Sequence, residues 1–403
     1  MFSKRTRLFS NFKIINILHI FQSLISKKKN FIDVLKKFLK KENIDLTSLG
    51  RTALYEIIKI IINDTKKNHF IISPYTIPAV IHSIKHAGGI VVYVDIDKTT
   101  GLINEDKLEK AINDTTAGII ITHLYSNCEN IKKFIKKFSG RVSIIEDAAI
   151  NFGAKVDDNY LGTLCDFGFY SFNIVKNLNT LNGGALYIKD NDKFKKYLSN
   201  KNKKNFPYVQ TINLLLTVAI IKLISNNYVY QVFHYFLKLV YLKKINFILK
   251  KIYPILFHNF EKKLPQIYSY DFNWIMNDVA IYNLKRIEKN YNERCAKAKL
   301  YNKLISDKVA TKTNCFSSDN ALLEYTLILK NIDNRKAHTI LMRNGYDVRH
   351  TWYINNLKKY NDKEINNFKD TNQIEDKVFC LPLHPNISET DIINITNIIN
   401  NFK

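Results

Sequence analysis

The sequence predicts an α/β protein with a large domain built on a mostly parallel sheet and a smaller α/β domain at the C-terminal end. Three observations support this prediction. At 403 residues, the chain is longer than one hydrophobic core usually organises. Between residues 70 and 188, short apolar runs alternate with helical segments, which is typical of a parallel sheet covered by helices on both faces. A shorter pattern of strands and helices follows from residue 322.

The individual elements follow from local patterns. A helix is predicted from residue 50 to about 63, because its apolar positions recur with the spacing of one helical face: Leu54, Ile57, Ile58 and Ile61. Strands are predicted at 70–72, 90–94, 118–122, 142–145 and 185–188, with intervening helices that include 78–86 and 105–112. A long helix is expected from Trp274 through Leu304. In the small domain we expect a strand at 322–329, a helix at 335–344, a strand at 347–349 and a closing helix after Ser388.

Basic residues are concentrated in two parts of the chain. The formal net charge is +25, part of which we attribute to a coding bias toward Lys, Asn and Ile. Residues 193–260 contain twelve Lys and no Asp or Glu, and residues 1–41 contain Asp33 as their only acid. We therefore divide the chain into a basic N-terminal segment (1–45), a large domain (46–270) with a basic, aromatic, helical insertion (193–263), and a linking helix with the small domain (271–403).

The composition argues against several other classes of protein. Nucleic-acid binding is not favoured, because no recognition motif is present and the basic residues alternate with apolar ones. The longest apolar run, residues 212–224, contains Lys222 and is too short for a membrane-spanning helix, which needs about 20 residues. The five cysteines lack metal-ligand spacing, and no signal-peptide cleavage site follows the N-terminal segment, so we expect a cytoplasmic protein with buried thiols.

The pattern with the most definite chemistry is a carboxylate followed by a hydroxyl and a lysine. Asp147 lies at the end of one apolar run. Ser171 and Lys176 lie in the loop that follows a later run. A pyridoxal phosphate site needs a lysine for the Schiff base and a carboxylate that keeps the pyridine nitrogen protonated. Taken alone, an Asp that ends a strand is more often a turn residue, and a Lys in such a loop is more often a solvated charge.

Eight stretches of the chain together indicate a family. They are Gly50–Leu54, Ser73–Thr76, Gly88–Asp97, Thr122–Tyr125, Glu146–Ala149, Gly168–Lys176, Gly183–Ala185 and Leu381–Pro385. In this order they resemble the DegT/DnrJ/EryC1/StrS family of pyridoxal-phosphate-dependent sugar aminotransferases, over residues 45–192 and 265–400. The resemblance implies the fold-type-I architecture of pyridoxal phosphate transferases.

The resemblance also implies which residues bind the cofactor. Lys176 would form the Schiff base, Asp147 would hold the pyridine nitrogen, and Ser171 would hold the phosphate. The backbone N–H groups of Thr52 and Ala53 would bind the same phosphate, which agrees with their position at a helix start.

Two further residues complete the implied site. Asn273 would reach the cofactor phosphate of the neighbouring subunit, which implies a homodimer with shared active sites. Tyr75 would stack on the cofactor ring, although Ile77 competes for this position. His123 is interpreted as a structural histidine, and Gly183-Gly184 as either a tight turn or a functional element. Arg349 and His350 could contact a sugar diphosphate or only solvate a strand end.

The function implied by this resemblance is amino transfer from glutamate to a nucleotide-linked keto sugar, in surface polysaccharide or related amino-sugar biosynthesis. Relatives that dehydrate sugars carry His in place of the lysine, so Lys176 favours transamination. Ile150 stands where the family usually has Gln or His, which removes a hydrogen-bond donor near the cofactor's phenolic oxygen. Two alternatives remain open: a catalytically altered relative that binds the cofactor, and an aminotransferase for a non-sugar ketone.

The sequence of the insertion suggests contact either with a membrane surface or with the protein itself. From Val229 to Ile252, apolar and aromatic residues keep helical spacing with lysines among them. Such helices suit the surface of an anionic bilayer, where each nearby Lys contributes ~1 kcal/mol. A helical hairpin packed against the enzyme or its dimer mate explains the same pattern, so peripheral membrane contact and internal packing both remain open.

Overall fold

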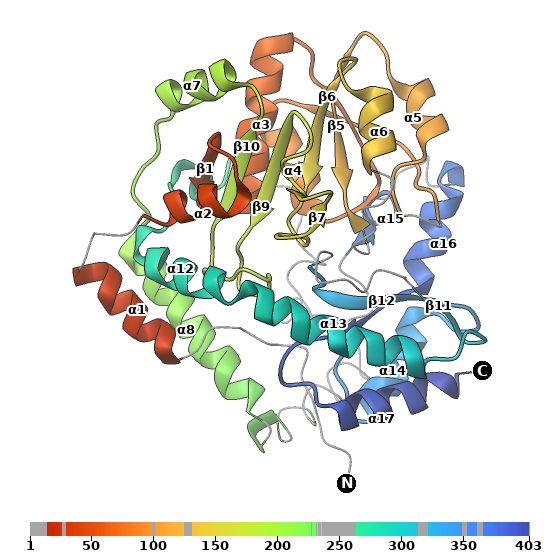
Figure 1. Cartoon of the computed structure of the whole chain (residues 1–403). Helices are drawn as coiled ribbons and strands as arrows, with labels where there is room; N and C mark the ends of the chain where they lie inside the picture. The colour runs from red at the N-terminus through yellow and green to blue at the C-terminus, as the bar shows by residue number, and fades with distance from the viewer. Residues whose placement is uncertain are drawn as a thin grey trace.

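The computed structural model consists of a large α/β domain above a smaller domain (Figure 1). It describes residues 14–25, 30–98, 101–124, 131–226, 228–230, 232, 235, 263–312, 321–348, 353–360 and 366–402. The predicted α/β class is confirmed, and the chain runs from the large domain through two helices into the small one.

A seven-stranded sheet forms the centre of the large domain, in the order β1-β10-β9-β6-β5-β2-β4. Its strands are β1 (Ile44–Thr47), β2 (His69–Ile72), β4 (Ile90–Tyr93), β5 (Thr116–Thr122), β6 (Ser143–Asp147), β9 (Phe167–Ser171) and β10 (Gly184–Ile188). The strands from β9 to β4 pair in parallel, whereas β10 and β1 pair antiparallel. The prediction of a mostly parallel sheet is confirmed, although β1 was missed and β9 was given no predicted range.

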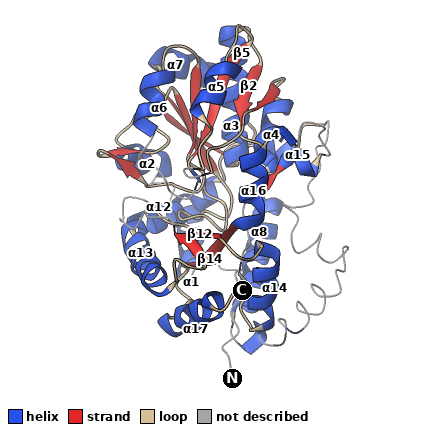
Figure 2. Ribbon diagram, turned by 90° about the vertical axis from the view of Figure 1, so that its right-hand side faces the viewer, coloured by secondary structure: helices blue, strands red, loops and turns tan. Residues whose placement is uncertain are grey.

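Helices cover both faces of this sheet (Figure 2). They are α3 (Gly50–Thr65), α4 (Pro78–His86) and α7 (Asn191–Asn200) on one face, and α5 (Glu105–Ala111) and α6 (Ile131–Phe138) on the other. Successive strand residues point to opposite faces, so Ile145 packs in the core cluster of α3 and α4 while Ile144 packs in that of α5 and α6. Both faces are therefore apolar, as a parallel sheet requires.

The link to the small domain is formed by η3 (Trp274–Met276), α12 (Asn277–Lys285) and α13 (Ile287–Leu304). The helical stretch that we predicted from Trp274 through Leu304 is interrupted at Arg286, whose backbone leaves helical geometry (φ −105°, ψ 4°). Figure 1 shows α12 and α13 running end to end across the molecule, from the large domain to the small one.

The small domain contains an antiparallel three-stranded sheet of β11 (Ala310–Lys312), β12 (Glu324–Leu329) and β14 (Val378–Pro382). Helices α14 (Asn334–Arg343), α16 (Lys369–Lys377) and α17 (Glu389–Asn400) accompany it, and Ser388 and Asp391 form a capping box that starts α17. The strand at 322–329 and the helix at 335–344 are confirmed. The strand predicted at 347–349 is wrong for its described residues, and β14 is the third strand instead.

Several shorter elements complete the structure. They are α2 (Phe31–Leu39), β3 (Tyr75–Thr76), β7 (Lys155–Val156), β8 (Asn159–Tyr160), η2 (Gln266–Ser269), β13 (Ile354–Asn355) and α15 (Asn356–Lys359). Strand β3 of the large domain pairs with β13, which follows the small-domain helix α14 in the sequence. This pairing ties the C-terminal half of the chain to the large domain.

Two further helices belong to the basic parts of the chain: α1 (Ile14–Ile25) in the N-terminal segment and α8 (Tyr208–Ser225) in the insertion. Among the helices that the structure describes, neither these nor any other is long and apolar enough to cross a membrane. Most of the amphipathic pattern predicted from Val229 to Ile252 lies outside the described residues.

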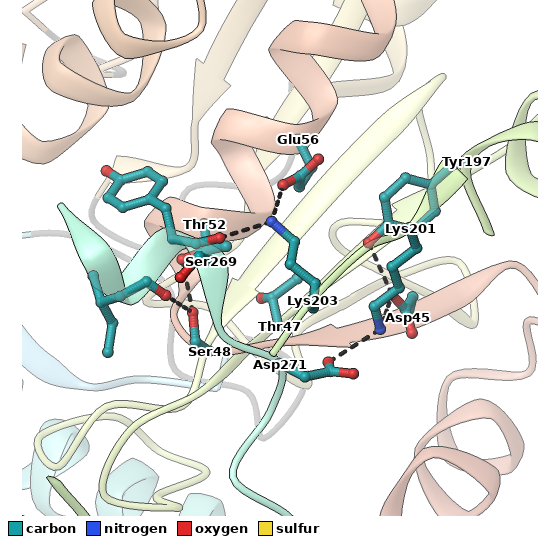
Figure 3. Close-up of polar contacts among 12 residues, drawn as sticks. Asp45, Thr47, Ser48, Thr52, Glu56, Tyr197, Lys201, Lys203, Ser269 and Asp271 are labelled. Atoms are coloured by element: carbon teal, nitrogen blue, oxygen red, sulfur yellow. Dashed lines mark hydrogen bonds and ion pairs between the residues drawn. The ribbon is translucent and has the colours of Figure 1, made fainter. Parts of the chain in front are cut away.

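The insertion leaves and re-enters the large domain at one point, which we call its base. The backbone N–H of Asp271 donates to the carbonyl of Lys204 (2.8 Å), so the two ends lie side by side. Figure 3 shows the ion pairs that surround this base: Lys201 with Asp45 (2.9 Å) and Asp271 (3.0 Å), and Lys203 with Glu56. The insertion is therefore fixed to strand β1 and helix α3.

Candidate active site

A cavity of about 230 Å³ lies at the C-terminal ends of β6 and β9, where ligands bind in sheets of this kind. Asp147, Ser171 and Lys176 all line it, so the structure brings together the three residues on which the chemical prediction depends. Other lining residues come from α3, from the segment before α4 and from the C-terminal half of the chain; they include Arg51, Ile77, Ile150, Asn173 and Tyr353.

Strand pairing explains why these residues meet. Strands β6 and β9 are parallel neighbours, with Asp147 opposite Phe169, so both strands end at the same edge of the sheet. Ser171 is the last residue of β9. The chain then turns, with the Lys176 N–H donating to the carbonyl of Asn173 (2.9 Å), and this turn brings the lysine back to the cavity.

The Asp147 carboxylate is buried at the floor of this site. Its Oδ1 accepts a hydrogen bond from the backbone N–H of Ala149 (3.0 Å). Burial raises the pKa of Asp147 above its ordinary value, and the positive charge of Lys176 acts in the opposite direction. The two side chains are therefore close enough to interact electrostatically, and the carboxylate would be further stabilised by a cationic ligand group.

His123 has a structural role, as predicted. Its Nε2 lies 3.1 Å from Glu146 Oε1, and both side chains are fully buried. The other carboxylate oxygen of Glu146 accepts the backbone N–H groups of Leu164 (2.7 Å) and Cys165 (3.1 Å). The histidine thus helps to fix the loop between β8 and β9 and does not line the cavity.

Glycines allow the start of α3 to lie directly against the strand ends. A Cβ atom on Gly50 would lie 2.8 Å from the Cβ of Ser171, and one on Gly184 would lie 2.5 Å from the backbone nitrogen of Gly50. Gly183 adopts φ +123°, which only glycine adopts readily. Gly183-Gly184 is therefore a turn that also permits this close approach.

Gly184→Ala is expected to lower the free energy of unfolding by about 2–3 kcal/mol, because the added Cβ would collide with backbone atoms rather than with a movable side chain. Gly88→Ala is a matched control. Its Cβ would meet nothing within 4 Å, so only the cost of φ +89°, about 1 kcal/mol, applies. Chemical denaturation of both variants measures the difference, and an equal or smaller loss for Gly184→Ala would contradict the packing argument.

Thr52 and Ala53 are not brought to the cavity in the way predicted. Their backbone N–H groups both donate to the carbonyl of Leu49, at 3.0 and 3.1 Å. In this turn the cavity is lined by Leu49, Gly50 and Arg51 instead. Arg51 was not predicted from the sequence, although an arginine in the first turn of a helix can indicate an anion-binding site.

Tyr75 also lies away from the cavity. Its side chain is fully buried, and its ring packs 5.8 Å from the ring of Tyr353. Ile77, the competing candidate, lines the cavity, and so does Tyr353. The sequence offered no signal for Tyr353, because it reaches the site from the far end of the chain through the pairing of β13 with β3.

Asn273 is fully buried and does not line the cavity of its own chain. Its Nδ2 donates to Thr211 Oγ1 in the first turn of α8 (2.9 Å), whereas its Oδ1 has no hydrogen-bond partner among the described residues. The insertion thus covers the residue for which we predicted a contact with the neighbouring subunit. Arg349 and His350 lie outside the described residues.

Several known proteins are similar to this chain in sequence. It is 31% identical to the dTDP-4-amino-4,6-dideoxy-D-glucose transaminase of Shigella dysenteriae over 181 residues, which are 44% of this chain and 47% of that protein. It is 27% identical to the GDP-perosamine synthase of Escherichia coli O157:H7 over 184 residues, 44% of this chain and 50% of that protein. The chain thus spans about half the length of these relatives.

The similarity in fold extends further. The E. coli GDP-4-keto-6-deoxy-D-mannose-3-dehydratase with bound hydrated PLP shares the fold over 100% of both chains, with a TM-score of 0.71 at 16% identity. The model of the DegT/DnrJ/EryC1/StrS aminotransferase family matches residues 19–206 and 259–400, so residues 207–258 of the insertion fall between the matched ranges. Since the match covers most of the sequence, the chain belongs to the DegT/DnrJ/EryC1/StrS aminotransferase family.

Proposed function

We propose that the protein is a pyridoxal-phosphate-dependent aminotransferase that transfers an amino group to a nucleotide-linked keto sugar. The observation that carries this proposal is the meeting of Lys176 and Asp147 in one cavity, close enough for their charges to interact, in a chain of this family. A lysine at this position, together with a buried carboxylate, suits amino transfer.

The residues present fit pyridoxal phosphate at both of its ends. At one end, Arg51 Nε is buried and has no hydrogen-bond partner among the described residues, and Ser171 lies beside the start of α3. A phosphate group placed there would satisfy the guanidinium and the helix start. At the other end, the buried carboxylate of Asp147 suits a protonated ring nitrogen.

When bound, pyridoxal phosphate supplies an aldehyde that takes up an amino group and a ring that accepts electrons. Lys176 would hold this aldehyde and would move the proton at the reacting carbon. Asp147 would keep the ring nitrogen protonated. Ser171 and Arg51 would hold the phosphate, in place of the predicted amides of Thr52 and Ala53. Ile77 and Tyr353, which line the cavity, would help to exclude water from it.

Glutamate is proposed as the amino donor and a nucleotide-linked keto sugar as the acceptor, in surface polysaccharide or related amino-sugar biosynthesis. The names of the two relatives, a dTDP-sugar transaminase and GDP-perosamine synthase, support this acceptor class. The test incubates the purified enzyme and cofactor with glutamate and either dTDP- or GDP-linked keto sugars, or a non-sugar ketone. Mass spectrometry detects the aminated product. Cofactor binding without transfer to any nucleotide sugar would contradict the proposal.

We further propose that the active enzyme is a homodimer in which Asn273 contributes to the neighbouring site. Asn273→Ala is then expected to weaken cofactor affinity, and mixing it with Lys176→Ala subunits restores activity, because the hybrid dimer contains one intact site. Thr211→Val is the control, since it removes the partner of Asn273 within the chain but keeps the amide. No recovery after confirmed subunit exchange, or equal affinity losses for both variants, would argue against a shared site.

For its location, we propose a cytoplasmic enzyme that contacts the inner membrane surface peripherally. The support is the acid-free, lysine-rich stretch from residue 193 to 260 and the similarly basic N-terminal segment.

A further inference from the structure

Helix α1 is packed with its polar side toward the protein and its apolar side toward solvent. Ser23 Oγ donates to Asp278 Oδ2 of α12 (2.7 Å), and Asn16 Nδ2 lies 3.4 Å from Asn283 Oδ1 of the same helix. Asn16 and Ser23 are 0% and 3% exposed. Most outward residues are apolar, with exposed fractions of 60%, 58% and 86% for Leu18, Phe21 and Ile25, and Gln22 is the exposed polar residue among them.

Helix α8 also has an apolar outward face, although its inward face is partly apolar too. Its inward face holds Thr211, bonded to Asn273, and Val218, which joins the core of the large domain. Its outward face is a stripe of large apolar side chains whose exposed fractions lie between 57% and 68%: Tyr208, Val209, Ile212, Leu216, Ile220 and Leu223. A helix that is apolar on its solvent side as well as its inner side needs an apolar partner.

The two helices lie in the same part of the molecule. Figures 1 and 2 place both α1 and α8 in its lower half, and Ile20 of α1 and Val218 of α8 belong to one core cluster with residues of α12. Buried hydrogen bonds on the inner faces fix both helices in this orientation, so the outward apolar faces are a property of the fold.

The charge of the surrounding chain indicates what covers these faces. Neither helix contains an acidic residue, and α8 carries Lys222 in its last turn. In the sequence, α1 is preceded by Arg7 and Lys13 and followed by three consecutive lysines, 27–29. A second copy of this chain would bring the same positive charge to these two faces, whereas anionic lipid headgroups complement that charge.

We propose that the outward faces of α1 and α8 form a docking surface for an anionic lipid bilayer. The apolar side chains enter the boundary between headgroups and acyl chains, and Lys222 of α8 contacts the headgroups. The surface contains no residue of the cavity, and α8 lies in the part of the chain that the family model does not match. The inference therefore assigns a surface to the membrane contact proposed above, and it does not depend on the proposed reaction.

Co-sedimentation with vesicles tests this surface. The full chain is expected to bind vesicles of phosphatidylglycerol and phosphatidylcholine at low salt, at least about tenfold more tightly than vesicles of phosphatidylcholine alone, and to lose most of this preference at high salt. The double variants Leu18→Gln/Phe21→Gln and Leu216→Gln/Ile220→Gln are each expected to weaken binding by about tenfold or more.

The matched control is Ile90→Gln/Ile393→Gln, which removes two apolar side chains that are 49% and 45% exposed on other elements. It should bind like the unchanged chain. Amino transfer and oligomeric state are measured on the same samples, so a failure of the proposed function is seen separately. The proposal is overturned if anionic vesicles are not bound at low salt, if the control weakens binding equally, or if the α1 and α8 variants change the oligomeric state without changing vesicle binding.

Discussion

Lys176→Ala should abolish amino transfer while leaving the fold intact. The lysine lies in a turn that is held by backbone hydrogen bonds and lines the cavity beside Asp147, so we expect its side chain to contribute chemistry rather than packing. Loss of the group that holds the cofactor and moves the proton is expected to lower the turnover rate by about 10⁴-fold or more. Stopped-flow or steady-state transfer from glutamate measures this rate, and circular dichroism checks the fold.

The control for this variant is Lys196→Ala, which removes an exposed lysine of α7 from outside the cavity. It should leave the rate unchanged. The absorbance of the cofactor when attached to a lysine should also disappear in Lys176→Ala alone. Retained transfer in that variant would remove the assignment of Lys176, and with it the main support for the proposed reaction.

Asp147→Asn should have opposite effects on catalysis and on the stability of the cofactor-free protein. With cofactor, the transfer rate is expected to fall roughly 10²–10⁴-fold, because the amide does not stabilise a protonated ring nitrogen. Without cofactor, burial raises the pKa of Asp147, so its contribution to stability is greatest below the ordinary pKa of an aspartate and is lost as the pH rises through the raised value. An asparagine at this position does not ionise, so the variant does not lose stability in this way as the pH rises.

The measurement is the free energy of unfolding of both proteins without cofactor, from acidic to neutral pH. Near neutral pH, Asp147→Asn should be at least as stable as the unchanged protein, and this advantage should shrink on acidification. A variant that is less stable at neutral pH would mean that the carboxylate has a structural role at this strand end. An unchanged transfer rate would lead to the same conclusion.

The core of the site was predictable because strand ends are visible in a sequence. Asp147 and Ser171 each end a β-rich run, and parallel neighbours bring such ends to one edge of the sheet. Arg51 and Tyr353 were not found, since their place in the cavity depends on packing between distant segments. Tyr75 and Ile77 are two residues apart beside the two-residue strand β3, too short a run to show which side chain faces the cavity.

Prediction of the fold was limited in the same way, because contacts between distant segments are not visible in the sequence. The parallel strands β2, β4, β5 and β6 are apolar runs and were found, whereas β1 and β14 were missed because their pairing partners are far away in the sequence. The first turn of α3 was located, but not which of its N–H groups are already bonded. Thr52 and Ala53 donate to Leu49, and this depends on the backbone geometry at the cap.

The base of the insertion also bears on how long this segment can be. Since Lys204 and Asp271 are joined by a backbone hydrogen bond, the insertion is a closed loop whose ends stay in place whatever its length. The entropy of closing a loop grows only with the logarithm of its length, so a doubling costs about 0.6 kcal/mol. Differences in length between this chain and others of similar fold are therefore expected to concentrate between these two residues. The segment could be lengthened, shortened or exchanged there without altering the positions of Asp147, Ser171 and Lys176.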